Sequence, residues 1–330
     1  MQKGILVTGG AGYIGSHVVR QLGERNEEVV ILDNLSTGFK DAVLHGNLVI
    51  GDTGDQDLVN DLIDQYNVET VMHFAAHTIV PESVENPLKY YKNNTANTRN
   101  LLECCQNKGV KHFVFSSTAA VYGEPETGLI TEESPTAPIN PYGMSKLMSE
   151  AMIKDVAHAC PMTHVILRYF NVAGSDPEGR IGQNTAKATL LTKVAVEAAV
   201  GKRDSVYIFG TDYDTFDGTG IRDYIHVEDL ASAHIKALDY LRDNGESTTV
   251  NAGYGHGYSV RQVLDMVNKV NGSPINIIET ARRAGDPPSL TAVVDKIKTV
   301  LGWEPQLDDL EAIVQSSLNW ERHLLTKQQC

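Results

Sequence analysis

Tyr142 and Lys146, a tyrosine and a lysine four residues apart, are the side chains of this sequence best suited to acid–base chemistry. Positions i and i+4 of a helix share one face, so a predicted helix over residues 141–158 would hold the two side chains together. A free tyrosine has a pKa of about 10, and a neighbouring ammonium group favours its phenolate. The pair is therefore a candidate base for an alcohol, and Thr118, which ends the preceding predicted strand, could orient that alcohol or share its proton.

A glycine-rich turn near the N-terminus predicts the site of a dinucleotide cofactor. The apolar run at residues 5–7 breaks into TGGAGYIG, where Gly10, Gly12 and Gly15 have the G-x-G-x-x-G spacing of pyrophosphate-binding turns. A helical pattern follows, and the N–H groups at a helix N-terminus attract phosphate. Asp33 ends the next apolar run, where a carboxylate accepts hydrogen bonds from the adenosine ribose and repels a 2′-phosphate. We therefore expect NAD rather than NADP.

Alternating apolar and amphipathic segments predict the elements that position these residues. Predicted strands cover residues 5–7, 48–50, 70–74, 111–117 and 165–169 with the run that ends at Asp33, and predicted helices cover 55–66, 87–107 and 141–158. A loop over about 171–186 leads to helices near 188–200, 227–243, 259–271 and 308–323 and strands near 206–209 and 275–279. The pattern predicts an α/β fold: a Rossmann-type doubly wound parallel sheet in residues 1–170, which later strands rejoin, and a smaller mixed α/β C-terminal substrate lobe, mainly residues 171–330.

Composition narrows the class of protein. The chain has 330 residues, of which 42% are hydrophobic and 21% charged, as is typical of a folded protein. Its net charge of -14 argues against a nucleic-acid partner. Cys104, Cys105, Cys160 and Cys330 lack metal-ligand or C-x-x-C spacing, so we expect no metal site and no disulfide framework. The predicted strand at residue 5 leaves no room for a signal peptide, and no apolar stretch is long enough to span a membrane. We expect a cytoplasmic protein.

Motifs along the whole chain resemble the extended short-chain dehydrogenases/reductases. They are TGGAGYIGSH at 8–17, DN at 33–34, NN at 93–94, SST at 116–118, VYG at 121–123, the Y-x-x-x-K pair at 142–146 and LGWEP at 301–305. Within that group PLKYYKNN, SSTAAVYG, PYGMSKLMSE, RYFNVAG, IFGTDY, DGTGIRDYIHVEDL and RRAGDPP resemble the UDP-glucose (UDP-galactose) 4-epimerases, in order. The resemblance implies NAD-dependent, reversible epimerisation of UDP-galactose and UDP-glucose at C4 through a 4-keto intermediate, in galactose metabolism, by a homodimer.

The resemblance also implies residue roles. Tyr142, Lys146 and Thr118 would be catalytic. The implied cofactor contacts are Gly9, Gly12, Tyr13, Ile14, Gly15, Asp33, Asn34, Asp52, Thr53, Phe74, Ala75, Ala76, Thr78, Asn94, Thr118, Tyr142, Lys146 and Phe170. The implied substrate contacts are Thr118, Tyr142, Asn171, Leu190, Phe209, Arg222, Arg283 and Asp286, with the arginines on the diphosphate, and Arg282 is left open. Arginine suits phosphate because its planar guanidinium presents a fork of donors.

Three positions depart from the resemblance. Leu190 replaces a polar residue that could contact substrate, Thr78 replaces a lysine found near the cofactor in some members, and Leu290 occupies a wall position of variable size. A bulky Leu290 would disfavour N-acetylated sugars, which favours glucose and galactose. The alternatives are another UDP-sugar, either an N-acetylhexosamine or a glucuronate, and a non-catalytic NAD-sensing protein. A 4,6-dehydratase is disfavoured because Ala119 and Ala120 stand where its acid and base would be.

Overall fold

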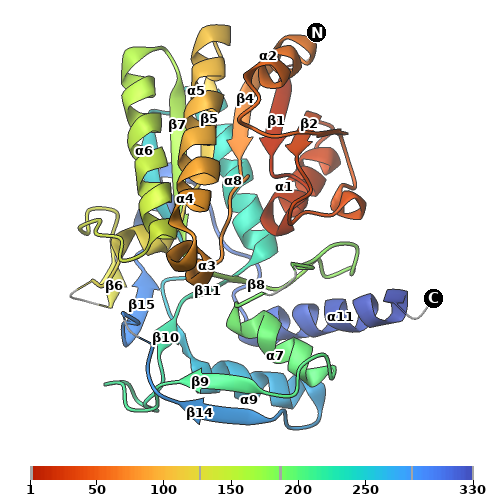
Figure 1. The fold of residues 1–330 in the computed structure, drawn as a ribbon, viewed down its shortest axis with the longest axis vertical. Coiled ribbons are helices and arrows are strands. Elements are labelled where there is room, and N and C mark those ends of the chain that lie inside the picture. The colour runs from red at the N-terminus through yellow and green to blue at the C-terminus, as the bar shows by residue number, and fades with distance from the viewer. Residues whose placement is uncertain (1–2, 126–127, 186–187, 284, 329–330) are drawn as a thin grey trace.

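The computed structural model describes residues 3–125, 128–185, 188–283 and 285–328, so Cys330 lies outside the described residues. A large parallel sheet with its helices fills the upper part of Figure 1, and a smaller lobe lies below it. The strand arrows β1, β2 and β4 point down toward the smaller lobe. The carboxyl ends of these parallel strands therefore face the C-terminal part of the chain, which is where ligands bind in folds of this type.

Seven strands form the large sheet in the order β12-β7-β5-β4-β1-β2-β3, and every neighbouring pair is parallel. Their bounds are β1 (Gly4–Thr8), β2 (Glu28–Asp33), β3 (Asn47–Ile50), β4 (Val68–His73), β5 (His112–Ser116), β7 (Thr163–Tyr169) and β12 (Thr248–Ala252). The chain winds outward from β1 through β2 and β3, then returns to β4 on the other side of β1. This order confirms the predicted doubly wound, Rossmann-type sheet.

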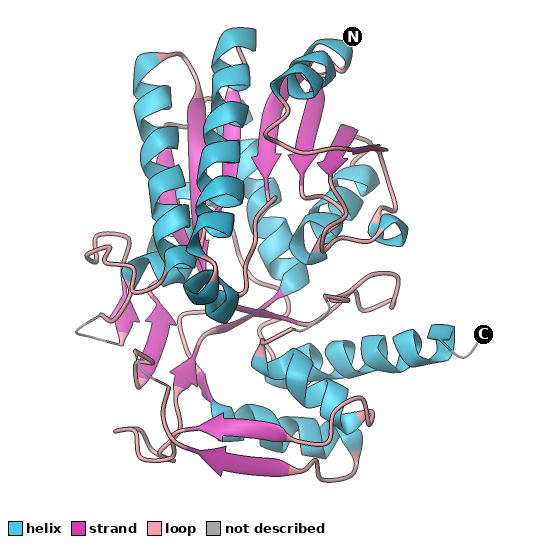
Figure 2. Ribbon diagram, viewed as in Figure 1, coloured by secondary structure: helices cyan, strands magenta, loops and turns pink. Residues whose placement is uncertain are grey.

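Helices cover both faces of the large sheet (Figure 2). The helices are α1 (Tyr13–Glu24), α2 (Gln56–Gln65), α3 (Val80–Glu85), α4 (Pro87–Tyr90), α5 (Asn97–Lys108), α6 (Pro141–Ala159) and α8 (Val227–Arg242), with 3-10 turns η1 (Lys40–Ala42) and η3 (Ala119–Tyr122). Successive residues of a strand point to opposite faces. In β1, Ile5 and Val7 accordingly belong to one buried cluster and Leu6 to the other, so the sheet divides two hydrophobic cores.

The smaller lobe contains short strands and most of the remaining helices, whereas the helix over 295–301 packs against β12 and α8. A four-stranded sheet has the order β13-β10-β15-β6, and β11-β8 and β14-β9 form two-stranded sheets. The bounds are β6 (Leu129–Ile130), β8 (Asn171–Ala173), β9 (Val206–Phe209), β10 (Ile221–Arg222), β11 (Tyr224–His226), β13 (Tyr258–Ser259), β14 (Ile277–Thr280), β15 (Ser289–Ala292), α7 (Leu191–Ala199), α9 (Val260–Asn271), α10 (Asp295–Leu301) and α11 (Leu310–Gln328). The mixed α/β character predicted for this part is confirmed.

The predicted continuous helix over 87–107 is wrong in detail. The chain forms α4, then a π-helical segment η2 (Tyr91–Ala96), then α5. A π-helical turn has one more residue than an α-helical turn, and such turns often occur at functional sites. Here it contains Asn94, one of the predicted cofactor contacts. Sequence periodicity cannot detect one extra residue in a turn, so the helix looked uninterrupted.

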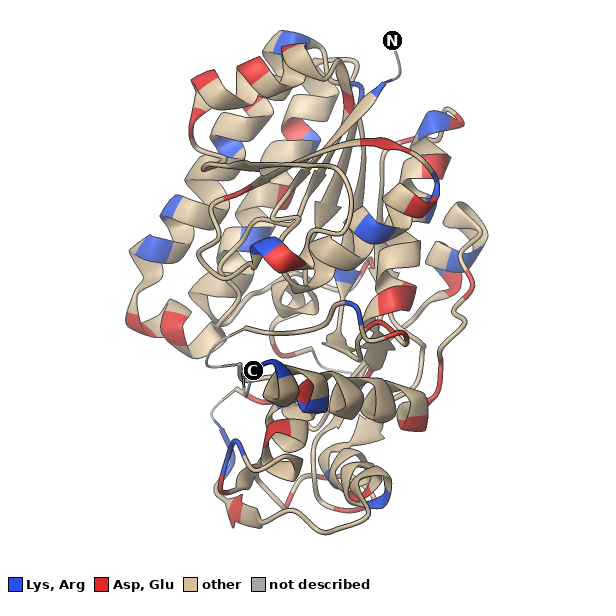
Figure 3. Cartoon of the chain, turned by 90° about the vertical axis from the view of Figure 1, so that its right-hand side faces the viewer, with Lys and Arg blue, Asp and Glu red and all other residues tan. Residues whose placement is uncertain are grey.

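Several short elements have no clear sequence signal. Sequence patterns miss β12, which completes the large sheet although it lies far along the chain. They also miss α3, α10 and the short strands β6, β8, β10, β11, β13 and β15. No helix of the described residues has both the length and the apolar character that crossing a bilayer requires. On the face shown in Figure 3, Lys and Arg alternate with Asp and Glu along the helices rather than forming a basic stripe.

Candidate active site

The glycine turn between β1 and α1 is shaped for close approach of a ligand. Gly9 has a φ of +71°, and a Cβ there would lie 2.5 Å from the backbone nitrogen of Ala75, which follows the neighbouring strand β4. A Cβ on Gly15 would lie 2.3 Å from the Gly9 carbonyl oxygen, whereas one on Gly12 would meet only that oxygen, at 3.2 Å. Gly9 and Gly15 thus allow the turn to close, and Gly12 leaves its outer side open. A cavity of about 120 Å³ borders Gly12 and Tyr13.

Helix α1 offers its N-terminus to an anion at this turn. Its N-cap residue, Gly12, makes no side-chain hydrogen bond to the first turn, and that turn contains no acidic residue. The N–H groups and partial positive charge of the helix start therefore point to the region that the pyrophosphate of a dinucleotide would occupy. The turn therefore fits the pyrophosphate of NAD, which would lie beside Gly12, Tyr13 and Ile14.

We expect Gly15→Ala to yield protein that has lost most of its bound cofactor. The added methyl group would meet the Gly9 carbonyl oxygen at 2.3 Å, so the turn must open and its N–H groups move away from the phosphates. The measurement is the ratio of NAD to chain in purified protein. Gly109→Ala is the matched control because that glycine, at φ +70°, has no atom within 4 Å of a built Cβ. Equal cofactor content in the two variants would contradict the role of the turn.

Acidic side chains lie at the ends of β2 and β3. The buried Asp33 carboxylate accepts hydrogen bonds from the backbone N–H groups of Ala11 (2.9 Å) and Leu35 (2.8 Å), which ties the glycine turn to the strand end. A carboxylate has further lone pairs, which leaves acceptor capacity for ribose hydroxyls. Asp52 accepts from the side-chain amides of Asn34 (3.1 Å) and Asn97 (2.7 Å). The structure therefore brings together Asp33, Asn34 and Asp52, as their predicted shared role requires.

Asn94 connects the predicted nicotinamide end of the site to α6. Its side chain accepts from the backbone N–H of His77 (2.8 Å) and donates to the His77 carbonyl (3.0 Å) and to the Ser145 hydroxyl (3.0 Å). The π-helical turn that carries Asn94 thus holds the segment after β4, which contains Thr78, against the helix that carries Tyr142. The nearby predicted contact Phe74 packs on His234, with ring centroids 4.8 Å apart.

Thr118, Tyr142 and Lys146 come together at the carboxyl end of β5. Tyr142 and Lys146 lie on the buried face of α6 at 7% and 2% exposure, and Tyr142 hydrogen-bonds to the Thr118 side chain. The Lys146 ammonium donates to the Ser116 carbonyl oxygen at 2.8 Å and lies 4.7 Å from the centroid of the Phe115 ring. The three predicted catalytic side chains therefore form one cluster at the edge of the sheet where ligands bind.

The pKa of Tyr142 corrects one sequence prediction. The sequence predicts that Lys146 lowers this pKa, but burial raises it, the nearby Tyr169 and Tyr90 raise it too, and only the Thr118 hydrogen bond opposes them. Burial also lowers the pKa of Lys146 to about 7. Both shifts have the same cause, since removing a charged form from water is unfavourable. The sequence shows which groups are neighbours but not how completely they are buried.

The predicted nucleotide contacts form two pairs across the smaller lobe. Arg222 on β10 forms an ion pair with Asp286, and the Arg283 guanidinium lies 3.6 Å from the centroid of the Phe209 ring at the end of β9. Leu290 is the register partner of Arg222 in the β10–β15 pair, which places the predicted wall residue beside this ion pair. Asn171 begins β8, and Leu190 is the N-cap of α7. The structure thus groups the arginines with an acid and an aromatic ring.

Arg282 and Tyr213 make a separate contact that sequence reasoning did not predict. The Arg282 Nε donates to Asp212 at 2.6 Å, and its guanidinium lies 4.2 Å from the centroid of the Tyr213 ring. The Tyr213 hydroxyl is buried without a hydrogen-bond partner in the described part of the chain. Tyr213 ends the IFGTDY motif of the resemblance, but spacing alone gives this tyrosine no role.

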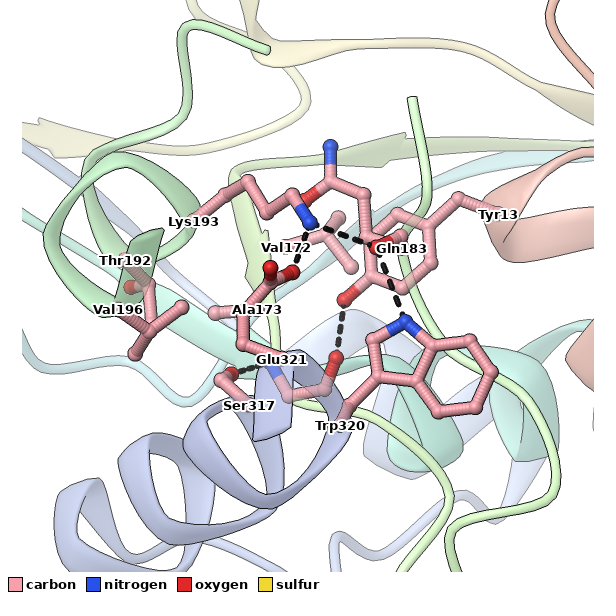
Figure 4. Close-up of a pocket in the computed structure, with 11 residues that line it drawn as sticks. Tyr13, Val172, Ala173, Gln183, Thr192, Lys193, Val196, Ser317, Trp320 and Glu321 are labelled. Atoms are coloured by element: carbon pink, nitrogen blue, oxygen red, sulfur yellow. Dashed lines mark hydrogen bonds and ion pairs between the residues drawn. The ribbon is translucent and has the colours of Figure 1, made fainter. Parts of the chain in front are cut away.

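A polar cluster fixes the loop after β8 beside Tyr13 (Figure 4). The Tyr13 hydroxyl donates to the Gly174 carbonyl at 2.6 Å, and Trp320 Nε1 donates to the Gln183 carbonyl at 3.0 Å. Buried Lys193 pairs with buried Glu321 around a cavity of about 10 Å³, roughly the size of one water molecule. Helices α7 and α11 are thereby held next to the predicted pyrophosphate contact.

The fold and these side chains define an enzyme of the short-chain dehydrogenase/reductase type that uses a nicotinamide dinucleotide. No cluster of three or more His, Cys, Asp or Glu ligands for a metal occurs in residues 3–125, 128–185, 188–283 or 285–328. A model of the NAD dependent epimerase/dehydratase family matches residues 5–253. The chain therefore belongs to this family.

Individual relatives are similar over nearly the whole chain. A UDP-glucose 4-epimerase of Azospirillum brasilense is 53% identical and covers 97% of this chain and 92% of its own. The solved structure of UDP-glucose 4-epimerase from Brucella ovis in complex with NAD has a TM-score of 0.94 and 41% identity, covering 96% of this chain and 98% of its own. The UDP-Glc/GlcNAc 4-epimerase of Campylobacter jejuni has a TM-score of 0.87 and 50% identity, covering 97% and 99%.

Proposed function

We propose that this chain is an NAD-dependent UDP-glucose 4-epimerase, which interconverts UDP-galactose and UDP-glucose through a 4-keto intermediate. The observation that carries the proposal is the cluster of Thr118, Tyr142 and Lys146 at the carboxyl edge of a cofactor-binding sheet. The near full-length similarity to UDP-glucose 4-epimerases supports the sugar nucleotide as substrate. The grouping of Arg222, Arg283 and Phe209 supports a diphosphate and a base as its anchoring parts.

In this mechanism the protein moves one proton and holds the nucleotide. Tyr142 takes the proton from the sugar 4-hydroxyl while Thr118, hydrogen-bonded to it, orients that hydroxyl. When bound, NAD would supply the acceptor for the hydride from C4 and the donor that gives it back. The arginines keep hold of the diphosphate while the keto sugar turns its other face. Tyr142 then returns the proton, so no cofactor is consumed.

The test is to give purified protein UDP-galactose without added nicotinamide and to follow UDP-glucose in a coupled assay. We expect UDP-glucose to form at once, because each chain retains its NAD. Failure to form it even after NAD is supplied would contradict the proposal. The alternatives to test next would then be UDP-glucuronate as the substrate and a non-catalytic NAD-sensing function.

N-acetylated substrates form the second candidate function. The named activity of the Campylobacter jejuni relative includes UDP-GlcNAc, whereas the bulk of Leu290 disfavours an N-acetyl group. Assaying UDP-N-acetylglucosamine in parallel with UDP-galactose decides between a dual and a single specificity. The homodimer and the cytoplasmic location stay predictions from the resemblance and from the sequence.

A further inference from the structure

Glu150 continues the row of active-site residues along α6. It follows Tyr142 and Lys146 at the same spacing of four residues, so the three side chains share one face of the helix. Glu150 is fully buried, at 0% exposure. A buried carboxylate is unfavourable unless it has charged or hydrogen-bonding partners, so its position under the catalytic pair needs an explanation.

The partners of Glu150 hold its carboxylate in one place. The Ser117 hydroxyl donates to Oε1 at 2.5 Å, and Arg168 on β7 donates through Nε to Oε1 (3.0 Å) and through Nη2 to Oε2 (2.6 Å). Arg168 is itself fixed, because its Nη1 donates to the Tyr122 hydroxyl at 3.0 Å. Lys154, a turn further along α6, reaches Oε2 at 3.8 Å. The carboxylate is therefore rigid, charged and close to the segment that contacts Lys146.

The charges around Lys146 leave Glu150 as the group that favours its ammonium form. Burial lowers the pKa of Lys146 to about 7, and the charge of Glu150 opposes this shift. His73 on β4 is neutral, since burial lowers its pKa to about 3. Tyr169 on β7 is also uncharged at neutral pH, because burial raises its pKa. The aromatic face of Phe115 adds a weaker attraction.

We propose that Glu150 is a positioning residue that keeps Lys146 charged and so selects the form of the pair in which Tyr142 is the base. This inference rests on the proposed function, because it assigns a role in the same proton transfer. Once the pair has lost one proton, the remaining proton lies either on Lys146, with a phenolate, or on Tyr142, with a neutral amine. Only the first form can accept a proton at the tyrosine. A carboxylate behind the lysine favours that form.

The sign of the effect on the pH profile follows from the charge. A nearby negative charge holds protons on the pair, so removing it lets the pair lose its first proton at lower pH. Arg168 would then keep its positive charge without a partner and act in the same direction. Removal also shifts the remaining proton from Lys146 to Tyr142, which lowers the fraction of active enzyme. Two changes are therefore expected together in the plot of kcat against pH. The plateau of kcat falls, and the acidic limb, where kcat rises with pH, moves to lower pH.

The experiment compares kcat for UDP-galactose against pH in the wild-type protein and in Glu150→Gln, which keeps the shape of the side chain. We expect the plateau to fall about tenfold and the acidic limb to move down by about half a pH unit or more. KM and retained NAD should stay close to the wild-type values, because Glu150 contacts neither ligand site. Glu150→Asp, which keeps the charge, should keep the limb in place.

Glu321→Gln is the matched control. Glu321 is another fully buried carboxylate with cationic partners, Lys193 and Lys202, but it belongs to α11. The Glu321→Gln substitution should destabilise the protein without moving the acidic limb of the pH profile. If Glu150→Gln does not fold, the double variant Glu150→Gln/Arg168→Gln removes both buried charges. The limb is then expected at lower pH by a smaller amount, because no unpaired arginine adds to the shift. A limb that stays in place, or one that Glu321→Gln moves equally, would overturn the role of Glu150.

The outcome for the wild-type protein separates this proposal from the proposed function. Wild-type turnover with an unmoved limb in Glu150→Gln overturns the role of Glu150 alone. If the wild-type protein does not turn over UDP-galactose, the proposed function fails. The ionisation of Tyr142 can then be followed by phenolate absorbance, as the difference from Tyr142→Phe. When the pH is raised, the first proton lost by the Tyr142–Lys146 pair should produce less phenolate absorbance in Glu150→Gln than in the wild-type protein. Equal absorbance in the two proteins would overturn the proposal.

Discussion

Tyr142→Phe is expected to lower kcat for UDP-galactose about 10³-fold while the protein keeps its fold and its NAD. The phenyl ring fills the same buried space on α6 but lacks the hydroxyl that hydrogen-bonds to Thr118 and takes the proton. General acid–base catalysis contributes about 10²–10⁴-fold to the rate of typical enzymes, so most of the turnover should disappear. The measurement is kcat in the coupled assay together with the NAD content of the purified variant.

Tyr254→Phe is the control for the loss of a buried hydroxyl. The Tyr254 hydroxyl donates to the Asp229 carboxylate at 2.7 Å and accepts from the His226 backbone N–H at 3.0 Å, away from α6. Its removal should reduce the free energy of unfolding by about 1–2 kcal/mol and leave kcat near the wild-type value. Near-normal turnover in Tyr142→Phe, or an equal loss in Tyr254→Phe, would defeat the assignment of Tyr142 as the base.

The sequence predicts most of the fold because the buried strands consist mostly of apolar residues. The apolar cores of β1, β2 and β7 have no exposed positions, and the run of apolar letters reveals each strand directly. Strand β12, with the sequence TTVNA, does not stand out, because two threonines and an asparagine find their place only through pairing with β7. Elements that depend on a distant partner carry little local signal.

The candidate site is predictable in its residue types but not in its electrostatics. Spacing alone places Tyr142 beside Lys146, and strand ends identify Asp33 and Thr118. The direction of the Tyr142 pKa depends on burial by segments remote in sequence, including Tyr90 and Tyr169. The Arg222–Asp286 ion pair likewise joins residues 64 positions apart. Contacts of this range arise from the tertiary fold, and no local pattern encodes them.

Lys146→Met is the second large effect, and we expect kcat to fall about 10²-fold or more with a reversed pH response. The methionine side chain keeps much of the buried volume but removes the ammonium group that shares the buried face of α6 with Tyr142. The first proton must then come from Tyr142 itself, whose pKa burial raises. Activity should therefore rise with pH across the accessible range instead of reaching a plateau near neutrality.

The direction of this change distinguishes two ways of disturbing the same pair. Loss of Lys146 moves the acidic limb to higher pH, whereas loss of the Glu150 carboxylate moves it to lower pH, because one removes a positive and the other a negative charge. Lys193→Met, which removes another buried lysine far from Tyr142, should leave the limb in place while it lowers stability. If the two substitutions only loosened the site, the acidic limb would move in the same direction in both variants or stay in place in both. Opposite shifts are expected only if the charge on Lys146 sets the ionisation of Tyr142, and Lys146→Met with an unchanged profile would refute that coupling.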